Sequence, residues 1–476
     1  MKRTVSIHKV MLPLLGCILS VQVIASEEAS PSFYGGRGMT QGEATGPKSE
    51  IEFQRRAIAP SIIVEANGEP LNEFESSSVL PINEVTPKKI TLDLSRLDRN
   101  DWLLAKKSKH YFDRNYHPET GLWDSVQGYH HATMWDVASG IAATIAAYDL
   151  ELASREVTKD TLTLTLNTLA ELPLYKNTLP NREYSTESGL PSGSYSESDS
   201  NGNGWSALDI GRLLIWLKVT QERFPDLSRD IEKILQRWSI EKAVKDGNLF
   251  GTKLYQGKEY YRQEGRLGYL QYAAQGFVLF GYDLDESFSW NHIEAVEVDN
   301  QKLLIDQRNL PYFTTDPYVL LAIEIGNLNA WWNQLDTLYE LHKSESALSG
   351  KLKVYAEDAM NKSPWFAYNN VYYYGKPWIS VSPGGKPIEN PQIFSNKVGF
   401  GLSVIFEDEF AATLTETVLN SSLSSRSIPT GIYENGGTNT AYNINTNSLV
   451  LTALWYKALG KNSIYDFVTN DSLVTQ

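Results

Sequence analysis

The sequence predicts an all-α fold in which inner and outer helices alternate in a closed double ring, the (α/α)6 toroid, with short β-hairpins in the loops. Eleven segments with helical periodicity follow one another between residues 94 and 459. Segments rich in Ala, Gly and Leu precede segments with a single apolar face, as inner helices would precede outer ones. No fixed-period repeat is found in the sequence, which favours a closed ring over an open solenoid.

The helices are expected where apolar residues recur with helical spacing between loops rich in Gly, Asn and Pro. The segment at 134–152 is apolar nearly all round, as an inner helix would be, whereas the one at 227–239 is one-sided. Residues 371–374 and 302–305 are β-prone and predict small hairpins. The eleven predicted helices span 94–116, 134–152, 159–172, 207–224, 227–239, 267–280, 317–327, 330–343, 396–406, 409–420 and 447–459.

Residues 1–25 have the pattern of a secretory signal peptide, because basic residues without any acid precede an apolar stretch at 10–25. We expect cleavage after Ala25 and a periplasmic or secreted product. The segment that ends at Cys17 also resembles a bacterial lipoprotein box, and a lipid anchor at Cys17 is the less favoured alternative because apolar residues continue after it. No later segment has the roughly 20 uninterrupted apolar residues of a membrane span.

The remaining chain divides into two parts by composition. Residues 26–87 are polar and rich in Gly, Ser, Pro and Glu, which predicts a flexible linker or arm. Residues 88–476 contain all the periodic segments and are expected to form a single domain.

Composition narrows the classes of partner. Aromatic residues make up 11% of the chain, and rings with a polar atom suit sugar binding. The formal charge of -14 would repel nucleic acid, which we do not expect as a partner. Cys17 is the single cysteine and would leave with the signal peptide, so the mature chain would have no thiol for a disulfide or for catalysis.

Acidic residues recur just before the apolar helices or in their first turns, which in a toroid meet at one mouth. They are Asp136, Asp209, Glu264, Asp316 and Glu434. Hydrolysis of a glycosidic bond needs two carboxyl groups, one to protonate the leaving oxygen and one to activate water or attack the sugar. The sequence therefore predicts a glycosidase site at this mouth.

These acids also have structural interpretations. Asp136 and Asp209 each follow a Thr or Ser by three residues, the capping-box pattern, and Asp316 precedes a proline as an N-cap would. Capping is the favoured role for these three, and it does not exclude sugar binding. Glu264 and Glu434 lack that pattern, and their alternative is a solvated loop. Glu264 lies among tyrosines, where burial would raise its pKa and suit a general acid.

Motifs for metal binding are incomplete. Residues 199–204 match the first half of a calcium loop, yet Ile210 stands where a bidentate Glu is required. His130 and His131 are adjacent, so they cannot share one helix face as zinc ligands do. We expect no metal and no cofactor. The pairs Trp331-Trp332 and Trp455-Tyr456 are expected to pack in the core rather than to bind sugar.

Several motifs carry a family resemblance. They are WDVAS (135–139), LPL (172–174) with LPN (179–181), GWSALDIGRLL (204–214), QEGRLGY (263–269), TDPY (315–318), and IYE (432–434) with NTN (445–447). In this order they resemble the bacterial domain-of-unknown-function family numbered 3131, over about residues 94–460. That family is similar to glucoamylase-like proteins and to endo-β-1,2-glucanases with an (α/α)6 fold. The resemblance implies a cell-envelope or extracellular glycan as substrate.

The resemblance also implies roles for individual residues. In glucoamylase-like barrels an acid precedes a middle inner helix and a base lies near the end of the domain, which places the acid at Glu264 and the base at Glu434. Glu183, which stands where a bulky or basic residue is expected, is a rival acid. Sugar hydroxyls would be bound by Asp136, Asp209, Arg212 and Asp316, and sugar rings would stack on Trp135, Trp205, Tyr269 and Tyr318.

The function predicted first is therefore an exported glycoside hydrolase that acts on a β-glucan or another envelope polysaccharide with inversion. A polysaccharide lyase is the enzymatic alternative, because helical toroids also host elimination with a Tyr base and tyrosines are abundant. A non-catalytic glycan-binding accessory of exopolysaccharide export is the other alternative, since it would need the aromatic residues but not the acids.

Overall fold

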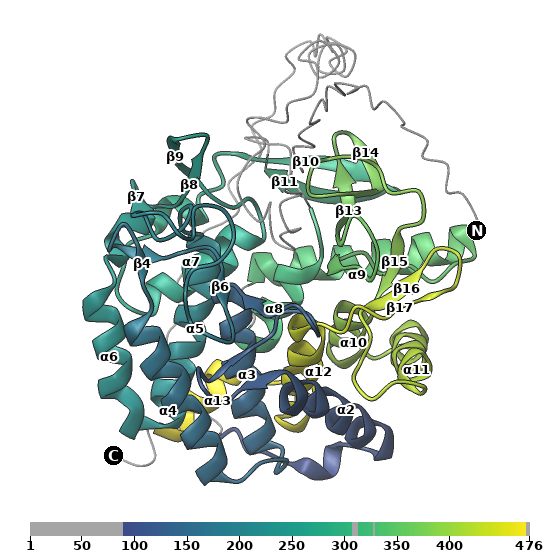
Figure 1. The fold of residues 1–476 in the computed structure, drawn as a ribbon. Coiled ribbons are helices and arrows are strands. Elements are labelled where there is room, and N and C mark those ends of the chain that lie inside the picture. Colours follow the sequence, from purple (N-terminus) through teal and green to yellow (C-terminus); the bar gives the residue numbers. More distant parts are fainter. Residues whose placement is uncertain (1–88, 307–312, 327–328, 473–476) are drawn as a thin grey trace, which may run out of the picture. The chain divides into compact units, whose positions relative to one another are not determined.

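The computed structural model describes residues 89–306, 313–326 and 329–472 (Figure 1). The predicted signal peptide at 1–25 and the predicted linker at 26–87 lie outside the described residues. Within the described part of the chain, no helix is both long enough and apolar enough to cross a membrane.

Each of the eleven predicted helices has a counterpart in the structure, with shifts of a few residues at the ends. The segment predicted at 94–116 is divided into a short 3-10 turn and α2, and α13 was not predicted. The helices are α2 (Arg99–Asn115), α3 (Met134–Asp149), α4 (Arg155–Glu171), α5 (Ala207–Arg223), α6 (Ser228–Arg237), α7 (Tyr269–Val278), α8 (Asp316–Glu324), α9 (Asn329–Ser349), α10 (Asn396–Ile405), α11 (Glu409–Ser422), α12 (Ile444–Ala458) and α13 (Ile464–Ser472).

Contacts between helices link six of them in a closed order. Helix α3 packs on α5, α5 on α7, α7 on α8, α8 on α10, α10 on α12, and α12 again on α3. The other helices pack outside this set, as α4 does on α3 and α11 on α10. Helix α3 is buried nearly all round, while α6 buries only Ile231 and Ile234, which agrees with the predicted alternation of inner and outer helices.

Helices α5 and α7 approach each other closely because glycines face the contact. A Cβ on Gly211 would lie 2.4 Å from the backbone oxygen of Ala273, and a Cβ on Gly276 would lie 1.9 Å from the backbone oxygen of Gly211. Real side chains do not fit at such distances, so glycine at both positions sets the spacing of these two helices.

Antiparallel strands are more extensive than the predicted short hairpins. The hairpins predicted at 302–305 and 371–374 are confirmed by the β10–β11 and β13–β14 pairs. The strands are β1 (Tyr116–His117), β2 (Leu122–Trp123), β3 (His131–Ala132), β4 (Leu174–Tyr175), β5 (Leu179–Pro180), β6 (Tyr184–Ser185), β7 (Val244–Lys245), β8 (Asn248–Tyr255), β9 (Lys258–Gln263), β10 (Ile293–Val298), β11 (Gln301–Asp306), β12 (Glu357–Ala359), β13 (Phe366–Tyr373), β14 (Lys376–Val381), β15 (Gln392–Ser395), β16 (Gly431–Tyr433) and β17 (Thr438–Asn439).

The β8–β9 hairpin was not predicted. Its two-residue turn is formed by Gln256 and Gly257, whose φ angles are +49° and +75°. Positive φ at both turn positions matches the twist of a hairpin, but the usual sequence signature is Asn-Gly or Asp-Gly. Because glutamine occupies the first turn position, the sequence pattern did not predict this hairpin, whose second strand ends directly before Glu264.

The core contains the large side chains that the sequence analysis assigned to packing. Trp455 is fully buried, and Trp331 is nearly so. Trp331 stacks on Tyr318 with ring centroids 4.5 Å apart, which joins α9 to α8. The prediction that Trp331 and Trp455 serve packing is confirmed.

Candidate active site

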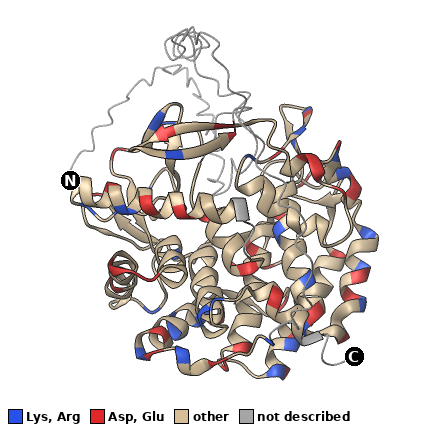
Figure 2. Cartoon of the chain, turned by 180° about the vertical axis from the view of Figure 1, so that it is seen from behind, with Lys and Arg blue, Asp and Glu red and all other residues tan. Residues whose placement is uncertain are grey.

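Buried charges mark the candidate site. Figure 2 shows acidic and basic residues spread along the helices. Burying a charge is costly unless it is paired, so charges that are buried together need a reason. The group comprises Arg212, Asp316, Glu324, Glu357, Asp358 and Lys397, all of them buried.

Four of these side chains line one pocket, which we call the Asp316 pocket. Its residues come from seven different elements, and several stand at the beginning of an inner helix, as the sequence analysis expected of site residues. Tyr269 and Asp316 are the first residues of α7 and α8, and Asn445 is the second residue of α12. The full lining is Trp135, Arg212, Tyr269, Asp316, Leu320, Glu357, Lys397, Asn445 and Leu449.

Lys397 is the cation at the centre of the carboxylates. Its Nζ lies 2.5 Å from Oδ1 of Asp316 and 3.4 Å from Oδ1 of Asp358, and it donates to the backbone oxygen of Glu357 at 2.5 Å. Burial lowers the pKa of Lys397, but the three neighbouring acids outweigh it and raise the pKa above its usual value. The ammonium therefore stays charged, and it competes with any metal ion for these carboxylates.

Asp358 lies behind Lys397 and is fully buried. Burial and the nearby Asp316 raise its pKa to about 7, although Lys397 acts in the opposite direction. The side chain of Gln392 donates to Oδ2 of Asp358 at 2.6 Å. Two acids thus share one ammonium, and the more deeply buried of them is half protonated near neutral pH.

Glu357 is linked to Asp316 through its backbone, because the Glu357 N–H donates to Oδ2 of Asp316 at 3.0 Å. The hydroxyl of Tyr269 donates to Oε1 of Glu357. The pocket thereby presents two carboxyl groups, one paired with an ammonium and one with a phenol.

An aromatic and a guanidinium group form another part of the lining. The guanidinium of Arg212 lies 4.6 Å from the ring centroid of Trp135, and that ring meets the ring of Tyr269 edge to face at 5.6 Å. Arg212 is held from behind by Glu324, at 3.2 Å, to which Trp216 also donates. Burial raises the pKa of Glu324, and Arg212 counteracts this.

Asp136 forms the predicted capping box. Its Oδ2 accepts from the Thr133 N–H at 3.0 Å, and the Thr133 hydroxyl accepts from the Asp136 N–H. Its other oxygen accepts from the Asn445 amide at 2.9 Å. Asp136 therefore caps α3 and also orients Asn445, which lines the Asp316 pocket.

The two other predicted caps differ from the prediction. The Ser206 hydroxyl accepts from the Asp209 N–H at 3.2 Å, which is the first half of a capping box. Asp316 is not the N-cap of α8, because Thr315 occupies that position and Asp316 is the first helical residue. The prediction of an N-cap at Asp316 is wrong, since its carboxylate binds Lys397 and the Glu357 N–H instead of the helix.

Glu264, predicted as the acid, lies between β9 and α7. Its fully buried side chain packs against the beginning of α5. It accepts from the Ala207 N–H at 2.6 Å and from Arg182 at 3.2 Å. Burial raises the pKa of Glu264 above its usual value, although Arg182 and the N–H groups of α5 act in the opposite direction. Its contacts stabilise the helix start, and it is not among the residues that line the Asp316 pocket.

Glu434, predicted as the base, has very different surroundings. It lies in the turn between β16 and β17, is exposed, and pairs with Lys351 at 3.3 Å. It does not line the Asp316 pocket either. The roles of Glu264 and Glu434 remain predictions.

The remaining predicted residues divide between pocket and packing. Trp135, Tyr269 and Arg212 line the Asp316 pocket. Trp205 packs against Tyr175 and donates from Nε1 to the Phe250 backbone oxygen, and Tyr318 packs on Trp331. The rival acid Glu183 is buried and accepts from the hydroxyl of Tyr129 at 2.5 Å.

The sequence analysis gave no role to Glu357, Asp358, Lys397 or Asn445, although Asn445 belongs to one of the motifs of the family resemblance. The first two lie on β12, outside the helix starts on which the search was based. Lys397 offered a signal, because a cation in the first turn of an otherwise apolar helix opposes the helix dipole and needs an acidic partner.

Comparisons with known proteins agree with this fold. The model of a family described as "Protein of unknown function (DUF3131)" matches residues 103–460. No curated protein matches the chain.

Similar solved structures include a candidate glucoamylase from Bacteroides caccae, with a TM-score of 0.57 and 9% identity over 79% of this chain and 98% of that one. An endo-β-1,2-glucanase from Chitinophaga pinensis, in complex with sophorotriose and glucose, has a TM-score of 0.56 and 10% identity over 81% of this chain and 98% of that one. An endo-β-1,2-glucanase from Talaromyces funiculosus with sophorose has a TM-score of 0.53 and 12% identity over 79% and 86%. At these identities the likeness is one of fold.

Proposed function

Because this chain belongs to the DUF3131 family, whose function is unknown, we propose its function from the site: a glycoside hydrolase that cleaves a glucan in the Asp316 pocket. We propose further that the six linked helices form the inner ring of an (α/α)6 toroid and that the protein is exported to meet an envelope or extracellular polysaccharide. The fold shared with endo-β-1,2-glucanases makes β-1,2-glucan the first substrate to test.

The observation that carries the proposal is the pair of carboxyl groups at Asp316 and Glu357 in one pocket. Asp316 is ion-paired with Lys397, which suits the ionised partner that activates water or attacks the sugar. Glu357 accepts a hydrogen bond from the uncharged hydroxyl of Tyr269. We assign to Glu357 the role of the general acid that protonates the leaving oxygen. Their two environments differ in charge, and such a difference separates an acid from a base.

The lining residues have the chemistry of a sugar site, but the cavity measures only about 10 Å³, which is room for one water molecule, so a sugar enters only when side chains of the lining move apart. Trp135 and Tyr269 supply aromatic surface for the apolar face of a pyranose, and Arg212 and Asn445 supply hydrogen-bond donors for its hydroxyls. Because Arg212 and Asn445 are themselves fixed by Glu324 and Asp136, these donors are oriented before a substrate arrives.

The test uses the chain from Ser26 onward with β-1,2-, β-1,3-, β-1,4- and α-linked glucans, and follows new reducing ends and ultraviolet absorbance together. We expect new reducing ends without an absorbing product, and their loss in Asp316→Asn and Glu357→Gln. Glu416→Gln, a change of an exposed glutamate on α11, is the matched control. The anomer of the first product, followed by NMR, tests the expected inversion.

Other outcomes would contradict the proposal. An absorbing, unsaturated product would indicate a lyase. Glycan binding without turnover across the panel would indicate an accessory protein. A further outcome is turnover that survives Asp316→Asn and Glu357→Gln but is lost in Glu264→Gln or Glu434→Gln. That result would identify Glu264 or Glu434 as the catalytic residue, as the sequence analysis predicted.

A further inference from the structure

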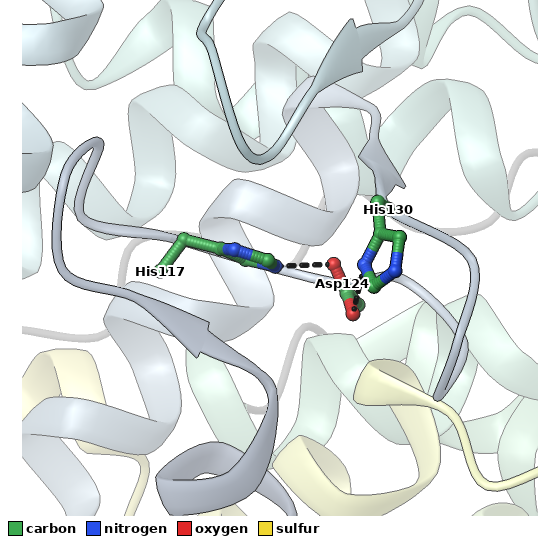
Figure 3. A group of neighbouring side chains, drawn as sticks. All are labelled: His117, Asp124 and His130. Carbon is green, nitrogen blue, oxygen red and sulfur yellow. Dashed lines mark hydrogen bonds and ion pairs between the residues drawn. The ribbon is translucent and has the colours of Figure 1, made fainter.

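Two histidines and an aspartate from three chain segments meet at one place outside the Asp316 pocket. His117 ends β1, Asp124 follows β2, and His130 precedes β3. Nε2 of His117 lies 2.7 Å from Oδ1 of Asp124, and Nδ1 of His130 lies 3.0 Å from Oδ2. Figure 3 shows the two rings approaching the same carboxylate from different sides. One candidate ligand atom from each of the three side chains lies within 4.8 Å of the other two.

The carboxylate in this group is buried and fixed in position. The Thr186 hydroxyl donates to its Oδ1 at 2.6 Å, and the Tyr111 hydroxyl donates to the backbone oxygen of Asp124 at 2.5 Å. The Asp124 N–H donates to the Asn115 backbone oxygen at 3.1 Å. Such supporting hydrogen bonds orient a ligand and are the usual second layer of a metal site.

We propose that His117, Asp124 and His130 bind a divalent transition-metal ion, with Zn²⁺ as the preferred ion; we call this the His117 site. Two imidazole nitrogens and one carboxylate form a donor set that zinc takes in proteins with a fourth position left to water. The side chain of His130 is half exposed, which leaves that position open to solvent.

The geometry needs only a small adjustment. Ligands about 2.1 Å from a tetrahedral zinc ion lie about 3.4 Å from one another. The three side chains therefore have to move by about 1 Å to enclose the ion, and the exposed ring of His130 is free to make most of that movement. Each ring nitrogen that now donates to Asp124 must release its hydrogen, and a neutral imidazole can carry that hydrogen on its other nitrogen.

The sequence analysis expected no metal because His130 and His131 are adjacent. The structure changes the pairing, since the partner of His130 is His117, whose ring lies at right angles to it with centroids 5.6 Å apart. The two histidines are brought together by the β1–β2 hairpin and the loop that follows it.

A metal at the His117 site would strengthen a contact of that loop with α12. The Ile444 N–H donates to the Ser125 backbone oxygen, and the Gln127 N–H donates to the Tyr442 backbone oxygen, both at 2.9 Å. Asn445, which lines the Asp316 pocket, is the next residue after Ile444. We therefore assign to the ion a stabilising role at the edge of the pocket, separate from the cleavage itself.

The test is calorimetric titration of ZnCl₂ into chelator-stripped protein, from Ser26 onward, with visible absorption of added Co²⁺ as a report on imidazole coordination. We expect one ion per chain, a rise in the thermal unfolding midpoint, and a loss of affinity of at least about tenfold in His130→Gln and in His117→Gln. His292→Gln changes a comparably exposed histidine next to Glu286 and should bind zinc as the unaltered protein does.

Absence of saturable binding at one ion per chain would overturn the proposal. Zinc affinity that is equal in His130→Gln, His117→Gln and His292→Gln would overturn it as well. Circular dichroism of each variant separates loss of a ligand from loss of the fold. Because the readout is metal affinity, it does not depend on whether the Asp316 pocket hydrolyses a glycan.

Discussion

The ammonium of Lys397 lies 2.5 Å from the carboxylate of Asp316, and both side chains are buried. The pair joins the beginnings of α10 and α8, two neighbours in the closed order of helices. It therefore serves the fold and the candidate chemistry at once, since the same contact connects two helices and sets the charge of the pocket.

Replacing Lys397 by methionine should destabilise the protein strongly. The change leaves Asp316 and Asp358 buried without their shared cation, and breaking one side of a buried pair typically costs about 3–5 kcal/mol. Lys343→Met breaks the exposed pair with Asp408 and should cost at most about 1 kcal/mol. Urea unfolding of both variants measures the difference, and equal losses would contradict the central role of Lys397.

Stability should depend on pH through Asp358. Its pKa is about 7 in the folded protein and ordinarily 3.8, so between these values the folded state holds a proton that the unfolded state has released. Protonated Asp358 therefore makes its full contribution to the free energy of unfolding below about pH 4. This contribution is lost as the pH rises through 7 and the buried carboxyl group ionises. Asp358→Asn should flatten this part of the profile of unfolding free energy against pH.

The control for that experiment is Asp113→Asn, which changes an exposed aspartate paired with Lys109. It should leave the slope between pH 4 and 7 as it is in the unaltered protein. A slope that persists in Asp358→Asn would assign the pH dependence to another group.

Local sequence patterns predicted the features that form within a few residues. Helical periodicity located eleven helices, and the Thr133–Asp136 capping box followed from a spacing of three. The expectation that acidic site residues begin inner helices also led to Asp316. Each of these inferences needs only the neighbours of a residue along the chain.

The rest of the candidate site depends on contacts between distant segments. Lys397 reaches Glu357 across 40 residues, and Glu357 reaches Asp316 across 41. No local pattern shows that β12 lies beside the beginnings of α8 and α10. Glu264 illustrates the same limit, because its neighbouring tyrosines suggested a site while its actual partners are Arg182 and the beginning of α5.

The close contact of α5 with α7 can be tested by Gly211→Ala. The added methyl group would lie 2.4 Å from the Ala273 backbone oxygen, so one of the two helices must shift. We expect a loss of about 1–3 kcal/mol in the free energy of unfolding, as overpacked cores show. Gly384→Ala has no neighbouring atom closer than 3.9 Å and should be nearly neutral. Similar effects of the two changes would argue against close packing at Gly211.

The decisive comparison for catalysis is Glu357→Gln against Glu264→Gln. Glu357 lines the Asp316 pocket, so its amide variant, which can still accept from the Tyr269 hydroxyl, should lose about 100-fold or more in kcat. Glu264 is buried against Arg182 and the α5 N–H groups, and removing its charge should lower the thermal midpoint.

Steady-state kinetics and thermal unfolding of both variants distinguish the two carboxyl groups. If Glu264→Gln keeps its thermal midpoint and abolishes turnover while Glu357→Gln remains active, then Glu264 is the acid and the Asp316 pocket is a structural charge cluster. The opposite pattern is expected, because Glu357 lines the Asp316 pocket, whereas Glu264 does not line it and its carboxyl group is occupied by Arg182 and the Ala207 N–H.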